Sequence, residues 1–150
     1  MREGQLLMVV CLIAGGAEIR VASRHAQPED EAIRRAIALL PNRPDKVVVV
    51  DVDNSAVLHE KLGRSEAFVT DGLRVVYVRK QGRTLQLSIR KGGIFDFALA
   101  GIIWHEMAHL DGADEPAARR KEEELWMQFI VQHRVDSVAG LQYLGDIRGH

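Results

Sequence analysis

The sequence predicts an α+β domain in which a small mixed sheet packs on a long apolar helix, and a second helix runs antiparallel to the first. Three observations support this fold class: a β-branched run at 46–53, a strand–turn–strand pattern around Asp71-Gly72, and two helical patterns that meet at Gly112. The chain has 150 residues, of which 47% are hydrophobic. We therefore expect residues 18–150 to form one domain with a packed core.

The N-terminal residues 1–17 are predicted to be a signal peptide. An apolar run at 6–14 is followed by small residues, and this run is too short to span a bilayer. Cleavage after Ala17 would export the mature chain to the periplasm or the medium, with no stable membrane insertion afterwards. The alternative is that the run is a buried first strand, and the chain is then cytoplasmic.

The next part of the chain is predicted to alternate short strands and helices. Apolar residues at helical spacing, β-branched runs and proline breaks together predict a strand at 19–21, a helix at 29–40, a strand at 46–53 and a short helix at 56–62 that is capped by residues 54–55. His59 lies on this short helix, where exposure to solvent is the simplest interpretation.

An antiparallel section is predicted to follow. Residues 68–69 and 73–79 flank the Asp71-Gly72 turn, and the alternation of residues 84–89 is typical of a half-buried strand. Gly92-Gly93 then ends the sheet, and the Asp96 carboxylate is expected to cap the next helix.

Two helices complete the predicted fold. The first runs from Asp96 to about residue 111 and ends at Gly112, and the second follows the start signal Asp114-Glu115-Pro116 and runs over 116–133. A short helix is expected at 135–144, with a frayed end from Gly145 onward.

The first of these helices carries the pattern His-Glu-x-x-His. His105 and His109 are four residues apart and share a helix face, at the spacing that one Zn²⁺ requires, while Glu106 lies about 100° round the helix, beside a metal-bound water. Apolar residues surround these three on nearly every side, and burial of three polar side chains is costly unless a bound metal satisfies them. Cys11 is the only cysteine, so the ligands must be His and carboxylate. The same donors also suit Fe²⁺ or Mn²⁺.

A third ligand is needed, because a hydrolytic zinc site has three protein ligands and one open position. A helical projection of 116–133 places Glu122 in the middle of an apolar face, at the height of the two histidines, which favours it as the ligand. Glu115 is the alternative, because a sharp turn at Gly112 could bring it under the metal. Its other possible role is to complement the helix dipole.

These residues resemble the zincin metallopeptidases. His105-Glu106-Met107-Ala108-His109 matches their zinc-binding helix, and the acidic second helix is similar to that of the gluzincin branch. The resemblance implies zinc ligation by His105 and His109, a general-base role for Glu106, and ligation by Glu122. His109 to Glu115 is also similar to the metzincin extension, but Glu115 stands where that branch usually has histidine. The resemblance also implies that an edge strand, here 73–79, aligns an extended substrate.

The sequence therefore predicts zinc-dependent hydrolysis of a peptide or protein substrate, with water activated by Glu106. Tyr77, Tyr143 and His133 could each donate to an oxyanion, but a structural role is expected for each. The alternatives are a non-catalytic metal-binding or regulatory protein and a helical interaction module without metal. A net charge of −1 gives no electrostatic case for nucleic-acid binding, and the sequence does not indicate the oligomeric state.

Overall fold

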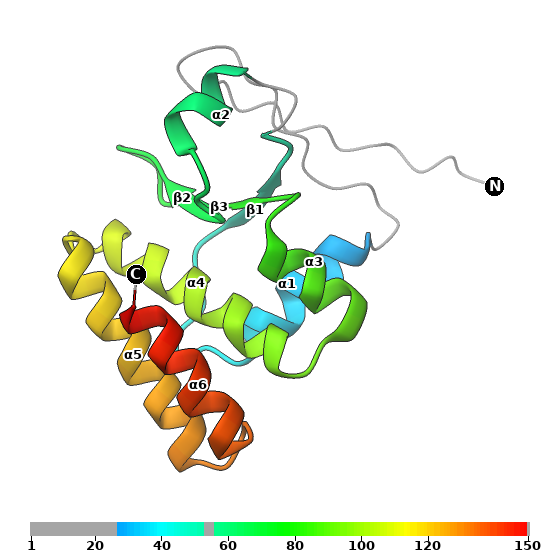
Figure 1. The fold of residues 1–150 in the computed structure, drawn as a ribbon. Helices are drawn as coiled ribbons and strands as arrows, with labels where there is room; N and C mark the ends of the chain where they lie inside the picture. Colours follow the sequence, from blue (N-terminus) through cyan, green and yellow to red (C-terminus); the bar gives the residue numbers. More distant parts are fainter. Residues whose placement is uncertain (1–26, 53–55, 150) are drawn as a thin grey trace.

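The computed structural model describes residues 27–52 and 56–149 (Figure 1). The predicted signal peptide at 1–17, the strand at 19–21 and the cap at 54–55 lie outside these residues. The helices and strands, in chain order, are α1 (Pro28–Ala38), β1 (Val47–Val50), α2 (Ala56–Leu62), β2 (Ala67–Val69), β3 (Val76–Arg79), α3 (Arg83–Lys91), α4 (Ile94–Leu110), α5 (Glu115–Val131) and α6 (Ser137–Arg148). The predicted α+β class is confirmed.

The sheet has three strands in the order β1-β3-β2. β3 pairs in parallel with β1 and antiparallel with β2, so the predicted mixed sheet is also confirmed. The strand expected at 73–79 begins only at Val76, and the expectation that it forms an edge is wrong. Val76, Tyr77 and Val78 are all buried, which suits a central strand that is covered on both faces. The edges of the described sheet are β1 and β2.

The strand predicted at 84–89 is instead the helix α3. Its N-cap, Gly82, has no side chain, but the Glu66 carboxylate accepts hydrogen bonds from the backbone N–H and from the hydroxyl of Thr84, each at 2.7 Å. Leu85 and Ser88 are buried three residues apart, on one helical face. The cap therefore comes from a residue 18 positions away, which the local alternation pattern does not reveal.

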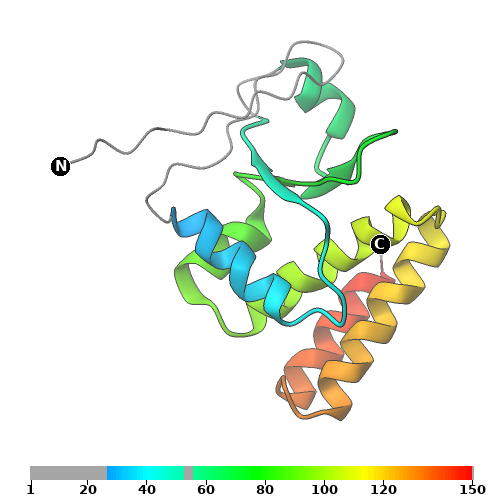
Figure 2. The ribbon, with the colours of Figure 1, turned by 180° about the vertical axis from the view of Figure 1, so that it is seen from behind.

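Helix α4 lies between the sheet and the α5–α6 hairpin, as Figures 1 and 2 show from opposite sides. On one side, Ala100 and Ile103 pack with the sheet and α1, and on the other Ala98 packs with α5 and α6. Because α4 packs against apolar residues on both sides, apolar residues occur all round this helix. The helix begins at Ile94 after Gly93, so the prediction that Asp96 is its N-cap is wrong.

Asp96 instead joins three helices. Its carboxylate accepts hydrogen bonds from Arg35 of α1, at 3.1 and 3.3 Å, and from the hydroxyl of Ser88 of α3, at 2.5 Å. Arg35 also donates to the backbone carbonyl of Ser88 at 3.0 Å. This network fixes the start of α4 against α1 and α3.

Helix α6 is longer than expected, because it continues to Arg148 instead of fraying from Gly145. Asp136 caps its start by accepting a hydrogen bond from the backbone N–H of Ala139. Near its end, Arg148 forms an ion pair with Glu123 of α5 at 3.0 Å, and Leu144 is buried in the core shared with α5. Among the described residues, no helix is both long enough and apolar enough to cross a membrane.

Candidate metal centre

The two histidines of the His-Glu-x-x-His pattern meet on one face of α4. The centroids of their rings are 4.9 Å apart, and the Nε2 atoms of His105 and His109 approach to 3.1 Å. Both side chains are largely buried, with exposed fractions of 14% and 22%. The spacing of one helical turn thus brings two imidazole nitrogens together, as the sequence pattern predicts.

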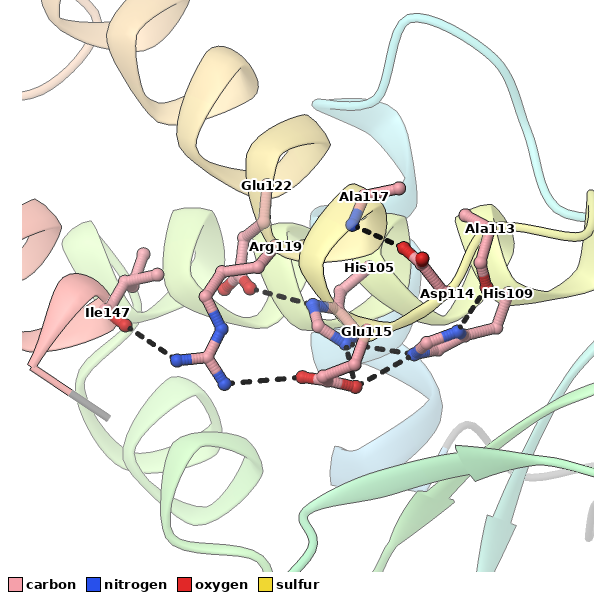
Figure 3. Close-up of polar contacts among 9 residues, drawn as sticks. All are labelled: His105, His109, Ala113, Asp114, Glu115, Ala117, Arg119, Glu122 and Ile147. Atoms are coloured by element: carbon pink, nitrogen blue, oxygen red, sulfur yellow. Dashed lines mark hydrogen bonds and ion pairs between the residues drawn. The ribbon is translucent and has the colours of Figure 1, made fainter.

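The third group at this point is Glu115, the first residue of α5 (Figure 3). Its Oε2 atom lies 3.4 Å from Nε2 of His105 and 3.2 Å from Nε2 of His109. These three residues form the group that could hold a metal ion, since their ligand atoms lie within 4.8 Å of one another.

A tight turn between α4 and α5 positions Glu115. Gly112 has a φ of +89°, a backbone conformation that favours glycine, and the backbone N–H of Ala113 donates to the carbonyl of Ala108 at the end of α4. Asp114 then caps α5 by accepting a hydrogen bond from the backbone N–H of Ala117 at 2.9 Å. The predicted helix stop at Gly112 is confirmed, and the turn brings the Ala113 carbonyl and the Glu115 carboxylate within hydrogen-bond distance of His109.

Hydrogen bonds on the far side of each ring determine which nitrogens face the centre. Nδ1 of His109 lies 2.9 Å from the backbone carbonyl of Ala113, which can only accept, so this Nδ1 carries a proton. Nδ1 of His105 lies 3.1 Å from Oε2 of Glu122, and an ionised carboxylate also only accepts. In the neutral rings, both Nε2 atoms therefore present lone pairs to each other and to Glu115. Three groups with lone pairs and no hydrogen to share repel one another, and a cation bound between them would remove this repulsion.

The distances fit a zinc ion. Ligand atoms bound at about 2.0–2.1 Å with tetrahedral angles lie roughly 3.3–3.4 Å from one another. The three separations here are 3.1, 3.2 and 3.4 Å. A single ion above the plane of the three atoms could therefore contact all of them with little movement of the side chains.

Glu122 lies on the buried face of α5, as the helical projection predicts, but its carboxylate contacts the far side of the His105 ring. The contact is with Nδ1 of His105 and not with the point where the Nε2 atoms meet. The hydrogen bond that His105 donates to Glu122 raises the pKa of His105 above its usual value, and this effect outweighs burial. A carboxylate behind a ligating histidine fixes the ring orientation and increases its basicity.

Glu106 is half-buried beside the centre. No hydrogen bond or ion pair engages its carboxylate in the part of the chain that the structure describes. Burial raises the pKa of Glu106, and the two neighbouring histidines oppose that rise. This carboxylate can therefore exchange a proton with a molecule at the centre without first breaking a contact.

Two further residues at the site are not identified from the sequence. Arg119 donates to Oε1 of Glu115 at 3.2 Å and to the backbone carbonyl of Ile147 at 3.3 Å. Burial would raise the pKa of Glu115, but the Arg119 hydrogen bond and the histidines together lower it below its usual value. Gly101 lies one turn before His105, and a Cβ atom there would be 2.9 Å from Nε1 of Trp126 and 3.5 Å from Oε1 of Glu122. Its position on the face of the histidines is the signal that could have identified it.

The other candidate oxyanion donors, and His59, lie in packed positions or away from the histidine pair. Tyr77 is fully buried in the sheet and stacks on Phe68, and Tyr143 stacks on Trp126, where burial, followed by the charge of Glu122, raises its pKa. His133 follows the C-terminal end of α5, the opposite end from Glu115. His59 is exposed on α2, with its Nδ1 atom 3.1 Å from the Arg79 guanidinium.

Comparisons with known proteins add no relative to this description of the site. Neither protein-family models, nor curated sequences, nor solved structures give a match to the chain.

Proposed function

We propose that this chain is a zinc-dependent hydrolase that cleaves peptide bonds, with His105, His109 and Glu115 as the zinc ligands and Glu106 as the general base. The observation that carries the proposal is the meeting of two imidazole Nε2 atoms and one carboxylate oxygen at separations of 3.1–3.4 Å. Both rings also donate from Nδ1 to a fixed acceptor, which is the usual arrangement of metal-bound histidine.

We assign Glu115 as the third ligand, although the sequence favours Glu122 and gives Glu115 only as the alternative. Oε2 of Glu115 faces both Nε2 atoms, whereas Oε2 of Glu122 lies 3.1 Å from Nδ1, on the far side of the His105 ring. To reach the ion, Glu122 would have to release that ring and leave a buried N–H without a partner, which costs about 1–3 kcal/mol. Glu122 then acts through His105, by holding its orientation.

A hydrolytic role is supported over a purely structural one by two features. Three protein ligands leave a fourth zinc position for water or substrate, whereas structural zinc sites are closed by four protein ligands. Glu106 directly follows His105, is close enough to both histidines for them to influence its pKa, and is not engaged elsewhere among the described residues. A structural site would have no use for such a carboxylate.

In the proposed reaction, a bound zinc ion would supply Lewis-acid chemistry and would make a bound water more acidic. Glu106 accepts the proton of the attacking water and then delivers it to the leaving amine. Glu115, His105 and His109 hold the ion, while Glu122 and the carbonyl of Ala113 keep the two rings in their ligating orientation.

A peptide substrate requires a surface that aligns its backbone, and β2 replaces 73–79 as the candidate strand. It is an edge of the described sheet, and its residues Ala67 and Val69 pack in the same core cluster as Ile103 and Met107 of α4. An extended peptide that adds to the free edge of β2 would therefore lie along the helix that carries the histidines.

The test is hydrolysis of a peptide library by the zinc-loaded chain, compared with Glu106→Gln and with Glu124→Gln as a matched control. Glu124 is an exposed glutamate of α5. We expect Glu106→Gln to keep its zinc and to lose about 10²–10⁴-fold in rate, and the control to be unchanged. A chelator should abolish cleavage, and zinc should restore it. Cleavage by Glu106→Gln at the wild-type rate would contradict the proposal, and a zinc-loaded chain that cleaves no peptide would point to a metal-binding protein without turnover.

A further inference from the structure

Arg119 forms a bridge between the proposed metal centre and the end of the chain. One guanidinium nitrogen donates to Oε1 of Glu115 at 3.2 Å, and the other donates to the backbone carbonyl of Ile147 in the last turn of α6 at 3.3 Å (Figure 3). The two acceptors belong to different helices. The guanidinium is therefore held at both ends of its fork.

Glu115 needs such a partner. Its side chain is 58% exposed at the start of a helix, so it has free rotamers to lose when it binds a metal. Of its two oxygens, Oε2 faces the histidines and Oε1 faces Arg119. Apart from the histidines, Arg119 is the only hydrogen-bonding or ionic partner of this carboxylate among the described residues.

The position of Arg119 depends in turn on α6. Its anchor, the Ile147 carbonyl, lies beside a second contact between the same two helices, the ion pair of Arg148 with Glu123 at 3.0 Å. The Arg148 pair joins α5 to α6 without contacting Glu115. Arg119 and Arg148 thus both join α5 to the last turn of α6, but only Arg119 also contacts a proposed metal ligand.

We propose that Arg119 is a positioning residue that, anchored on the Ile147 carbonyl, holds Glu115 as a one-oxygen ligand and so strengthens the binding of zinc at the centre. This inference rests on the proposed function. Hydrogen bonds to a ligating carboxylate typically contribute 10–100-fold to metal affinity. The arginine occupies Oε1, which leaves only Oε2 available to the ion.

The sign of the effect separates this role from simple electrostatics. A positive charge close to a bound cation repels it, so charge alone predicts that loss of Arg119 makes zinc bind more tightly. If Arg119 instead positions Glu115, its loss should make zinc bind more weakly. The direction of the change in the zinc dissociation constant therefore decides between the two explanations.

The experiment measures zinc affinity of the full chain by competition with a chromophoric chelator, for the wild type, Arg119→Met, Arg119→Lys and the matched control Arg148→Met. We expect Arg119→Met to bind zinc about 10–100-fold more weakly, and Arg148→Met to stay within about twofold of the wild type. Arg119→Lys keeps the charge but has a single donor nitrogen in place of the guanidinium fork, so it cannot span both acceptors. Its zinc affinity should be intermediate, and it would also report on the site if Arg119→Met fails to fold.

The visible spectrum of the Co²⁺-substituted chain gives a second readout that loss of stability would not move. Release of Oε1 in Arg119→Met lets Glu115 bind through both oxygens, and the intense absorption of four-coordinate Co²⁺ should weaken as the coordination number rises. Equal or tighter zinc binding by Arg119→Met, with an unchanged Co²⁺ spectrum, would overturn this inference and leave the proposed function standing. A wild-type chain that binds no zinc would overturn both.

Discussion

At the scale of single residues, the two histidines show what helical spacing can and cannot predict. Residues four apart share a helix face, so the meeting of His105 and His109 follows from the sequence alone. The projection that placed Glu122 on the inner face of α5 is also correct, since this residue is buried. A projection cannot tell which nitrogen of a ring a carboxylate will reach, however, and Glu122 lies at Nδ1 of His105.

The position of Glu115 depends on a turn and not on a periodic pattern. Its carboxylate reaches the histidines because Gly112 adopts a positive φ and Asp114 starts α5 at once. The sequence shows the residues that form this turn, but it does not show how close the turn brings Glu115 to the histidines. Glu115 could therefore be proposed from the sequence only as the alternative ligand.

Gly101 provides a test of the packing behind the ligands. A Cβ atom at this position would lie 2.9 Å from Nε1 of Trp126, which is fully buried, so the two helices would have to move apart. We expect Gly101→Ala to be less stable than Gly145→Ala by about 1–3 kcal/mol in urea unfolding.

Gly145 is a suitable control because it also lies within a helix, and a Cβ atom there would meet nothing within 4 Å. Both substitutions gain the same helix propensity of about 1 kcal/mol, so the difference between them reports the steric contact. Equal stability of the two variants would show that α4 and α5 do not approach closely at Gly101.

At the scale of secondary-structure elements, α3 shows that a local alternation of apolar residues does not by itself distinguish a strand from a helix. The alternation of residues 84–89 is compatible with a strand, but Leu85, Ser88 and Ile89 also lie on one side of a helix. The helix is favoured by a cap from Glu66, which lies just before β2. Interactions between distant residues of this kind cannot be read from a short window of sequence.

This cap leads to a prediction about α3. Glu66→Ala would leave the backbone N–H and the largely buried hydroxyl of Thr84 without their acceptor, so we expect a loss of about 1–3 kcal/mol in the free energy of unfolding. The exposed Glu124→Ala on α5 should change stability by no more than about 0.5 kcal/mol. Similar unfolding midpoints for both variants would be inconsistent with a capping role for Glu66.

At the scale of the whole molecule, the sequence predicts the layers better than the connections between them. The apolar character of α4 indicated a central helix, and α4 does lie between the sheet and the α5–α6 hairpin. The strand order β1-β3-β2 could not be predicted, because strand pairing is set by contacts between distant residues. The expected edge strand 73–79 was wrong for this reason.

The arrangement of layers also explains why the proposed centre can be rigid. α4 carries both histidines, α5 carries Glu115 and Glu122, and α6 braces α5 through the Ile147 carbonyl and Arg148. Packing of Trp126 and Phe129 against α4 and α6 fixes the helices that hold these side chains. Rigid elements that position ligands in advance reduce the entropy lost when an ion binds.

The most direct test of this account is the zinc content of the purified chain, measured by elemental analysis for the wild type, His109→Ala, Glu115→Gln and Glu122→Gln after equilibration at the same free zinc concentration. We predict one zinc per wild-type chain, loss of the metal in His109→Ala and Glu115→Gln, and retention in Glu122→Gln with affinity reduced about 10–100-fold. The absence of zinc from the wild type would contradict the proposed centre. Loss of zinc in Glu122→Gln with retention in Glu115→Gln would contradict the assignment of Glu115 as the third ligand.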